Sequence, residues 1–215
     1  MLNTQAQSII TQRRVCIVIF DEVEVLDFCG PFEVFSVTGG RQGLMPFDVC
    51  TVAEEKKPVR TRGGLSVNAA HSFENCPPAD IVLIPGGPGT RRELNNQRMI
   101  RWIRERAKNA HLVLSVCSGA LLLAKAGLLD GLTATTHHGA LDELRVINPN
   151  IRVDDTKRFV DNGRVIASGG ISAGIDMSLH VVARLLGQDQ ALETARYMEY
   201  EWNHGSPGNV TRNCD

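Results

Sequence analysis

Residues 111–129, HLVLSVCSGALLLAKAGLL, carry the pattern that decides the fold. The run up to Val116 is almost entirely apolar, as expected for a strand buried on both faces of a sheet. Small residues follow around Cys117, and residues 120–129 then have the composition of an apolar helix. A strand that turns sharply into a helix is the elbow arrangement that presents a nucleophile. The stretch therefore predicts an α/β protein with Cys117 as its reactive thiol.

Strands alternate with helices along the rest of the chain, which is typical of a mostly parallel sheet sandwiched by helices. Strands are expected at residues 15–20, 47–53, 59–67, 80–85, 111–116, 133–136 and 165–168. Helices are expected at residues 27–37, from 90 onward, at 120–129, after 170 and at 189–202. Thr90 and Glu93 have the spacing of a capping box. Asn162-Gly163 predicts the turn of a small β-hairpin.

These elements form one doubly wound α/β domain at residues 15–203, between polar tails at 1–14 and 204–215. The chain has 23 lysines and arginines against 24 acidic residues, a net charge near −1. This balance provides no positive field for a nucleic acid or an anionic membrane. No apolar run approaches the roughly 20 residues of a membrane span, and the N-terminus does not resemble a secretory signal. We therefore expect a cytoplasmic protein with neither kind of partner.

The six cysteines have no CxxC spacing, and several lie in apolar, strand-like runs. A chain of this length buries a core without cross-links, so neither a disulfide framework nor a structural zinc site is expected. Cys16 and Cys50 are interpreted as small buried apolar residues.

Ligands of doubly wound sheets bind beyond the carboxyl ends of the strands. Functional groups follow four predicted strands: Asp27, the Gly86-Gly87 turn, Cys117 and His137. The helix N-terminus at Cys117 should favour thiolate over thiol. Amides there and at the glycine turn could stabilise a developing negative charge. A raised pKa would let Asp27 share a proton with the thiol.

Structural roles remain alternatives for three titratable residues, Asp27, His137 and Asp176. Asp27 suits a helix cap as well as an acid–base role. His137 has the position of a hydrogen-bonded structural histidine. Asp176 is better explained by a dipole or capping role in the first turns of its helix.

Five segments resemble the ThiJ/PfpI superfamily of class I glutamine amidotransferase-like proteins, and with the first strand they span nearly the whole chain. They are VEVLDFCGPFEVF, DIVLIPGGPGT, SVCSGALLLAKAGLLDG, ATTHH and GGISAGIDMSLH. The LDxxGP and GGISAGID segments narrow the resemblance to the branch of isonitrile hydratases and AraC-type sensor domains. The resemblance implies a flavodoxin-like fold and a homodimer. It also implies that Cys117 is the nucleophile and Asp27 its protonation partner.

Two positions separate the chain from other branches. Intracellular proteases of the superfamily have histidine where this chain has Ser118, and deglycase-like members have glutamate where it has Asp27. Hydratases have threonine after the cysteine, and Ser118 keeps that hydroxyl. The expected catalytic residues are therefore Cys117, Asp27 and Ser118, with Gly86, Gly87 and His137 on the substrate.

The implied activity is that of an isonitrile hydratase, a hydro-lyase that converts a small electrophilic isocyanide and water into an N-formamide without metal or cofactor. A glyoxalase-like enzyme for 2-oxoaldehydes and a non-enzymatic redox or ligand sensor are the alternatives. A DNA-binding role is not expected, because only about a dozen residues follow the last predicted helix, against the ~50 or more of a helix-turn-helix domain.

Overall fold

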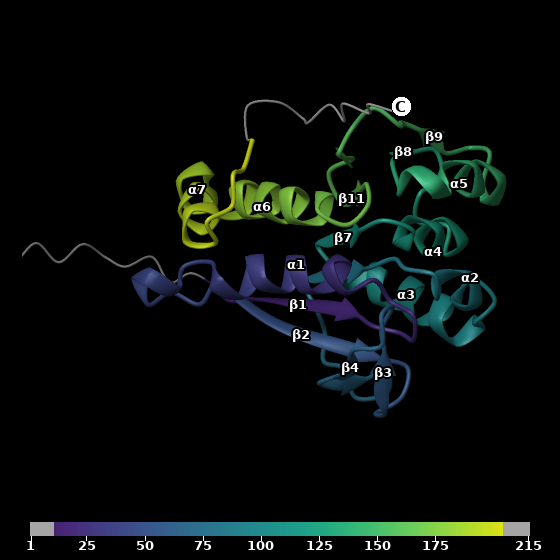
Figure 1. The fold of residues 1–215 in the computed structure, drawn as a ribbon, viewed down its shortest axis with the longest axis horizontal. Helices are drawn as coiled ribbons and strands as arrows, with labels where there is room; N and C mark the ends of the chain where they lie inside the picture. Colours follow the sequence, from purple (N-terminus) through teal and green to yellow (C-terminus); the bar gives the residue numbers. More distant parts are fainter. Residues whose placement is uncertain (1–10, 204–215) are drawn as a thin grey trace, which may run out of the picture.

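The structure is a computed structural model that describes residues 11–203. Its main sheet has the strand order β10-β11-β7-β6-β1-β2-β5, and every neighbouring pair is parallel except β10 and β11. The strands are β1 (Arg13–Val18), β2 (Phe47–Ala53), β5 (His71–Ser72), β6 (Ile81–Ile84), β7 (Leu112–Ser115), β10 (Phe159–Asp161) and β11 (Val165–Ser168). Strands β6 and β7 are buried along their whole length, because helices cover both faces of the sheet (Figure 1).

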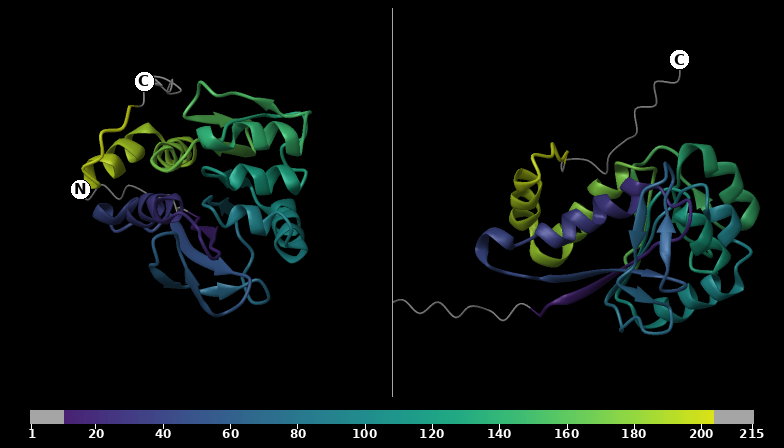
Figure 2. Two further views of the ribbon diagram at one scale, coloured as in Figure 1. Left: turned by 45° about the vertical axis from the view of Figure 1, so that its right-hand side comes forward. Right: turned by 60° about the horizontal axis from the view of Figure 1, so that its bottom comes forward.

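The helices lie in two groups, one on each face of the main sheet. Figure 2 shows one group, which contains α1, α6 and α7, on the opposite side of the sheet from the helices α2 to α5. The first group is α1 (Val25–Val37), α6 (Ala173–Leu186) and α7 (Gln188–Tyr197), with the short η1 (Gly40–Gln42) after α1. The second is α2 (Thr90–Glu93), α3 (Gln97–Asn109), α4 (Gly119–Lys125) and α5 (Leu141–Ile147), with η2 (His138–Ala140) before α5. The predicted flavodoxin-like, doubly wound α/β fold is confirmed.

Two small sheets lie beside the main one. The strand expected at 59–67, broken by Gly63-Gly64, is a pair of antiparallel strands, β3 (Pro58–Arg60) and β4 (Ser66–Asn68). Gly63 and Gly64, with φ of 84° and 88°, turn the chain between them, a conformation that glycine adopts without steric cost. The strand expected at 133–136 is β8 (Thr133–Ala134), which pairs with β9 (Arg152–Val153) outside the main sheet.

The chain turns as expected between β10 and β11. These strands are antiparallel, and Gly163 at the turn has a φ of 83°. The predicted hairpin is confirmed.

A helix starts at residue 90 as expected, but the predicted capping box is wrong. Thr90 is the first residue of α2, and its hydroxyl donates to the carbonyl of Gly87 at 2.7 Å rather than capping the helix. The longer helix, α3, starts one turn later, where the Asn96 side chain accepts the amides of Arg98 and Met99. The Thr90 hydroxyl, which the local spacing assigned to a helix cap, instead contacts Gly87 and, from a distant part of the chain, Ser118.

The last helix, expected to reach residue 202, ends at Tyr197. Glu199 has a φ of 51°, and Tyr200 donates its hydroxyl to Asp176 at 3.0 Å. Asp176 also pairs with Arg158, so it joins three segments rather than acting as a helix cap.

The first strand starts close to the expected position. Strand β1 starts at Arg13, two residues before the expected boundary at 15. Residues 1–10 and 204–215, which include Cys214 and most of both predicted tails, lie outside the described residues. Among the described helices, none combines the length and apolar composition needed to cross a bilayer.

Candidate active site

Cys117 occupies a strained elbow between β7 and α4. Its φ is 56°, a left-handed conformation that costs a non-glycine residue on the order of 1–3 kcal/mol. Close approach of the end of β6 holds the elbow in place. A Cβ at Gly119 would lie 2.1 Å from the carbonyl oxygen of Ile84, and a Cβ at Gly86 would lie 2.9 Å from the Cβ of Cys117. The small residues around the cysteine are therefore needed for packing as well as for the turn.

Asp27 lies in the first turn of α1 with no solvent exposure. Its Oδ2 accepts the Gly86 amide at 3.0 Å. Within residues 11–203, no donor meets both the distance and the angle of a hydrogen bond to its buried Oδ1. Burial raises the pKa of Asp27 to about 7, although hydrogen bonding from Gly86 and from the Cys117 thiol favours the carboxylate. Asp27 is not the helix cap, because that position belongs to Glu24.

Cys117 is protonated in this environment. Its side chain is buried, and burial together with the negative charge of Asp27 raises the pKa of the thiol to about 12. The Ser118 amide acts in the opposite direction but is outweighed. The expectation that the helix N-terminus would favour a thiolate is thus wrong: desolvation and a neighbouring carboxylate dominate. Near neutral pH the pair holds its shared proton on sulfur.

The glycine turn is occupied by internal hydrogen bonds. Gly86 donates its amide to Asp27, and Gly87 donates to the Ser118 hydroxyl at 3.0 Å. The Thr90 hydroxyl oxygen lies 3.1 Å from that of Ser118. The expectation that the Gly86 and Gly87 amides stabilise a developing anion is therefore not met in this conformation. Ser118, which is 2% exposed, joins the glycine turn to the elbow.

His137 faces the same cavity but already has a structural partner. Its Nδ1 accepts the amide of Gly139 at 3.1 Å, so in the neutral ring Nε2 carries the proton. Burial, and then the charges of His138 and Arg91, lower its pKa. The strand that precedes it, β8, is not part of the main sheet. The hydrogen-bonded structural role is the one that the geometry favours, with an Nε2–H left available as a donor.

A cavity of about 260 Å³ opens at Cys117. Two of its lining residues, Glu24 and Arg62, form an ion pair at 2.7 Å. A third, Arg91, pairs at 2.5 Å with Glu143, which lies outside the lining. Asp27, which is fully buried, does not line the space. The lining residues are Glu24, Arg62, Gly87, Pro88, Arg91, Cys117, Ser118, His137, Gly139, Ala140 and Ile171.

Sequence reasoning missed the charged rim and Ile171. Ile171 has a φ of 55°, and its backbone amide contributes to lowering the pKa of Asp27. The Gly169-Gly170 pair just before Ile171 was the available sequence signal for this segment. It lies next to the elbow, where the Gly169 carbonyl accepts the amide of Cys117 at 3.0 Å. No local pattern marks Glu24, Arg62 or Arg91.

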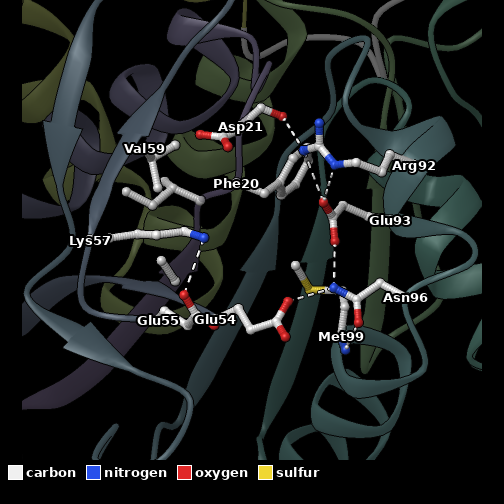
Figure 3. A pocket seen from close by; sticks show the side chains of 12 residues that line it. Phe20, Asp21, Glu54, Glu55, Lys57, Val59, Arg92, Glu93, Asn96 and Met99 are labelled. Atoms are coloured by element: carbon white, nitrogen blue, oxygen red, sulfur yellow. Dashed lines mark hydrogen bonds and ion pairs between the residues drawn. The ribbon is translucent and has the colours of Figure 1, made fainter.

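A second cavity, of about 270 Å³, lies at the ends of β1 and β2 (Figure 3). Ile19, Phe20 and Met99 contribute apolar walls. The polar groups are occupied with one another: the Asn96 amide bridges Glu54 at 2.6 Å and Glu93 at 2.8 Å. No cysteine, serine, threonine or histidine lines this space, so the cavity at Cys117 is the candidate active site. Within residues 11–203, no set of three or more His, Cys, Asp or Glu side chains is arranged to hold a metal ion.

Comparison with known proteins points to one family. The model of the DJ-1/PfpI family matches residues 13–184. Isonitrile hydratase from Pseudomonas putida is 35% identical over 193 residues, which cover 88% of this chain and 81% of that protein. The HTH-type transcriptional regulator GbdR from Pseudomonas aeruginosa is 24% identical over 93% of this chain. That match covers 55% of the regulator, so the chain spans about half its length.

Solved structures give the same fold. A ThiJ/PfpI family protein from Pseudomonas syringae superimposes with a TM-score of 0.81 and 28% identity, covering 92% of this chain and 80% of that one. An AraC family transcriptional regulator from Pseudomonas putida has a TM-score of 0.75 over 86% of this chain and 99% of the other. At 20% identity, the second likeness shows the fold alone.

Proposed function

The chain belongs to the DJ-1/PfpI family, and we propose that within it the chain is a cysteine-dependent hydratase of isonitriles. The observation that carries the proposal is the buried pair of Cys117 and Asp27 at the end of a small cavity. An acid with a pKa of about 7 can accept the thiol proton and return it at neutral pH. The identity of 35% with an isonitrile hydratase supports the substrate class.

In the first step the sulfur of Cys117 attacks the terminal carbon of the isocyanide. Asp27 takes the thiol proton as the S–C bond forms and delivers it to the same carbon, which leaves a thioimidate. Holding the thiol as S–H until attack suits this sequence, because the proton that leaves sulfur is the one the carbon needs.

In the second step water adds to the thioimidate carbon. Asp27, again a carboxylate, accepts one water proton and passes it to the departing sulfur as the S–C bond breaks. The other water proton goes to nitrogen, and the oxygen becomes the carbonyl of the N-formamide. Water and the protein's own groups complete both steps, and we assign to His137, which lines the cavity, the role of donating its Nε2–H to the substrate nitrogen.

A panel of aliphatic and aromatic isocyanides tests the proposal, with formamide release followed by chromatography. We expect turnover by the wild-type protein and none by Cys117→Ser, with both proteins folded by circular dichroism. The panel should include a 2-oxoaldehyde, because a thiol–carboxyl pair can also attack a carbonyl. Conversion of the 2-oxoaldehyde to its 2-hydroxy acid, with no formamide from any isocyanide, would indicate the glyoxalase-like activity in place of the hydratase.

A sensor without turnover is the second candidate, and the match to GbdR over 93% of this chain favours it. In that case the cavity at Cys117 binds a ligand reversibly. Calorimetry on the same panel separates the two candidates: binding without product formation indicates a sensor, and product formation indicates the enzyme.

A further inference from the structure

Three buried thiols meet away from the active site. Cys16 lies in the middle of β1, Cys50 lies beside it on β2, and Cys76 lies in the segment between β5 and β6. The Cys16 sulfur is 3.3 Å from that of Cys50 and 3.4 Å from that of Cys76. All three are free, and none is more than 8% exposed. Sequence reasoning treated the first two as inert apolar residues and did not connect them with the third.

The three thiols differ in their surroundings. Cys16 is fully buried, and its close thiol neighbours and burial raise its pKa. Cys76 has two guanidinium groups in its electrostatic environment, Arg106 and Arg14, and Arg106 also donates to its carbonyl at 2.6 Å. The hydrogen bond from Cys16 and these two positive charges lower the pKa of Cys76 to about 7. The contact with Cys16 and the charge of Arg14 lower the pKa of Cys50 as well, so the charge of Arg106 is what distinguishes Cys76 and favours its thiolate.

We propose that Cys76 and Cys16 form a reversible dithiol–disulfide site for peroxides. The Cys76 thiolate attacks a peroxide oxygen: an S–O bond forms, the O–O bond breaks, and the leaving oxygen departs as water after protonation. Cys16 then attacks the Cys76 sulfur, so that an S–S bond forms and the second oxygen leaves as water. The two thiols lose two electrons and two protons in total, and hydrogen peroxide is reduced to two molecules of water.

The position of Cys76 in the chain selects this pair over Cys16 and Cys50. Cys16 and Cys50 are partners in the parallel register of β1 and β2, so backbone hydrogen bonding on both strands holds their positions. Cys76 lies outside the strands, where the backbone can shift with less loss of pairing. Closing the gap from 3.4 Å to the roughly 2.05 Å of a disulfide requires a movement of that segment rather than of the sheet.

Peptide mapping of the full-length protein under non-reducing conditions tests the proposal. After brief treatment with hydrogen peroxide we expect a cross-linked peptide pair containing Cys16 and Cys76, two hydrogens lighter than the separate peptides, which dithiothreitol reverses. Cys76→Ser should abolish the cross-link, whereas Cys29→Ser, a half-buried cysteine outside the cluster, should leave its yield unchanged. Circular dichroism of each variant checks the fold.

Three results would overturn the proposal. They are a Cys16–Cys50 cross-link in its place, irreversible oxidation of Cys76 without a cross-link, and oxidation confined to Cys117. The wild-type map alone decides among them, so a variant that fails to fold does not weaken the test. The site is independent of Cys117, and Cys117→Ser should form the same cross-link.

Discussion

Replacing Asp27 with asparagine tests two consequences of burying a carboxyl beside a thiol: its part in proton transfer, and its effect on stability at alkaline pH. Asparagine has nearly the same shape, and its side-chain oxygen can keep the hydrogen bond from Gly86, but it carries no titratable proton. We therefore expect Asp27→Asn to fold and to lose turnover. Proton transfer by a positioned group is worth about 10²–10⁴-fold in rate, and that is the expected loss in kcat/KM.

The same substitution should stabilise the protein at alkaline pH. Burial raises the pKa of Asp27 from 3.8 to about 7, so the folded protein binds this proton more tightly than the unfolded chain does. The contribution is favourable below about pH 4 and is lost as the pH rises through 7, which costs the wild type up to about 4 kcal/mol above that pH. Asp27→Asn escapes this cost and should be the more stable protein at pH 8.

Denaturant unfolding at pH 5 and pH 8, together with turnover at both values, measures these effects. Asp142→Asn is the matched control, because that side chain is 96% exposed and its replacement should alter neither. An Asp27→Asn protein with wild-type turnover would remove Asp27 from the mechanism. A stability gain no larger at pH 8 than at pH 5 would show that the carboxyl is not held in its neutral form by burial.

Further outcomes follow from the same site. The wild-type kcat/KM should rise with pH through about 7, as Asp27 becomes the carboxylate that accepts the thiol proton; a flat profile from pH 5 to 9 would contradict this. Gly86→Ala should destabilise the fold by about 1–3 kcal/mol or more, because the new Cβ would lie 2.5 Å from the Ser118 nitrogen. Gly40→Ala, with nothing within 4 Å, should leave the unfolding midpoint nearly unchanged. Light scattering should give the mass of a homodimer at micromolar concentration, as the family resemblance implies, and a monomeric mass would refute that expectation.

The order of strands and helices was predictable because it depends on local side-chain patterns. Continuous apolar runs identified β6 and β7, and the small residues after β7 identified the elbow at Cys117. The rule that ligands bind beyond the carboxyl ends of parallel strands then brought Asp27 and the glycine turn to the same place. Each of these inferences needs only neighbouring residues and a known architecture.

Protonation and hydrogen-bond partners depended on residues that are distant in the chain. The helix N-terminus at Cys117 suggested a thiolate, but the burial of the thiol and the charge of Asp27 reverse that preference. Thr90 had the spacing of a cap, yet it bonds to Gly87 and Ser118. Cys16, Cys50 and Cys76 have unremarkable spacing, and only strand register and the path of one connecting segment bring their sulfur atoms into contact. Electrostatic energy and hydrogen bonding depend on distance in space and on access of water, neither of which local sequence contains.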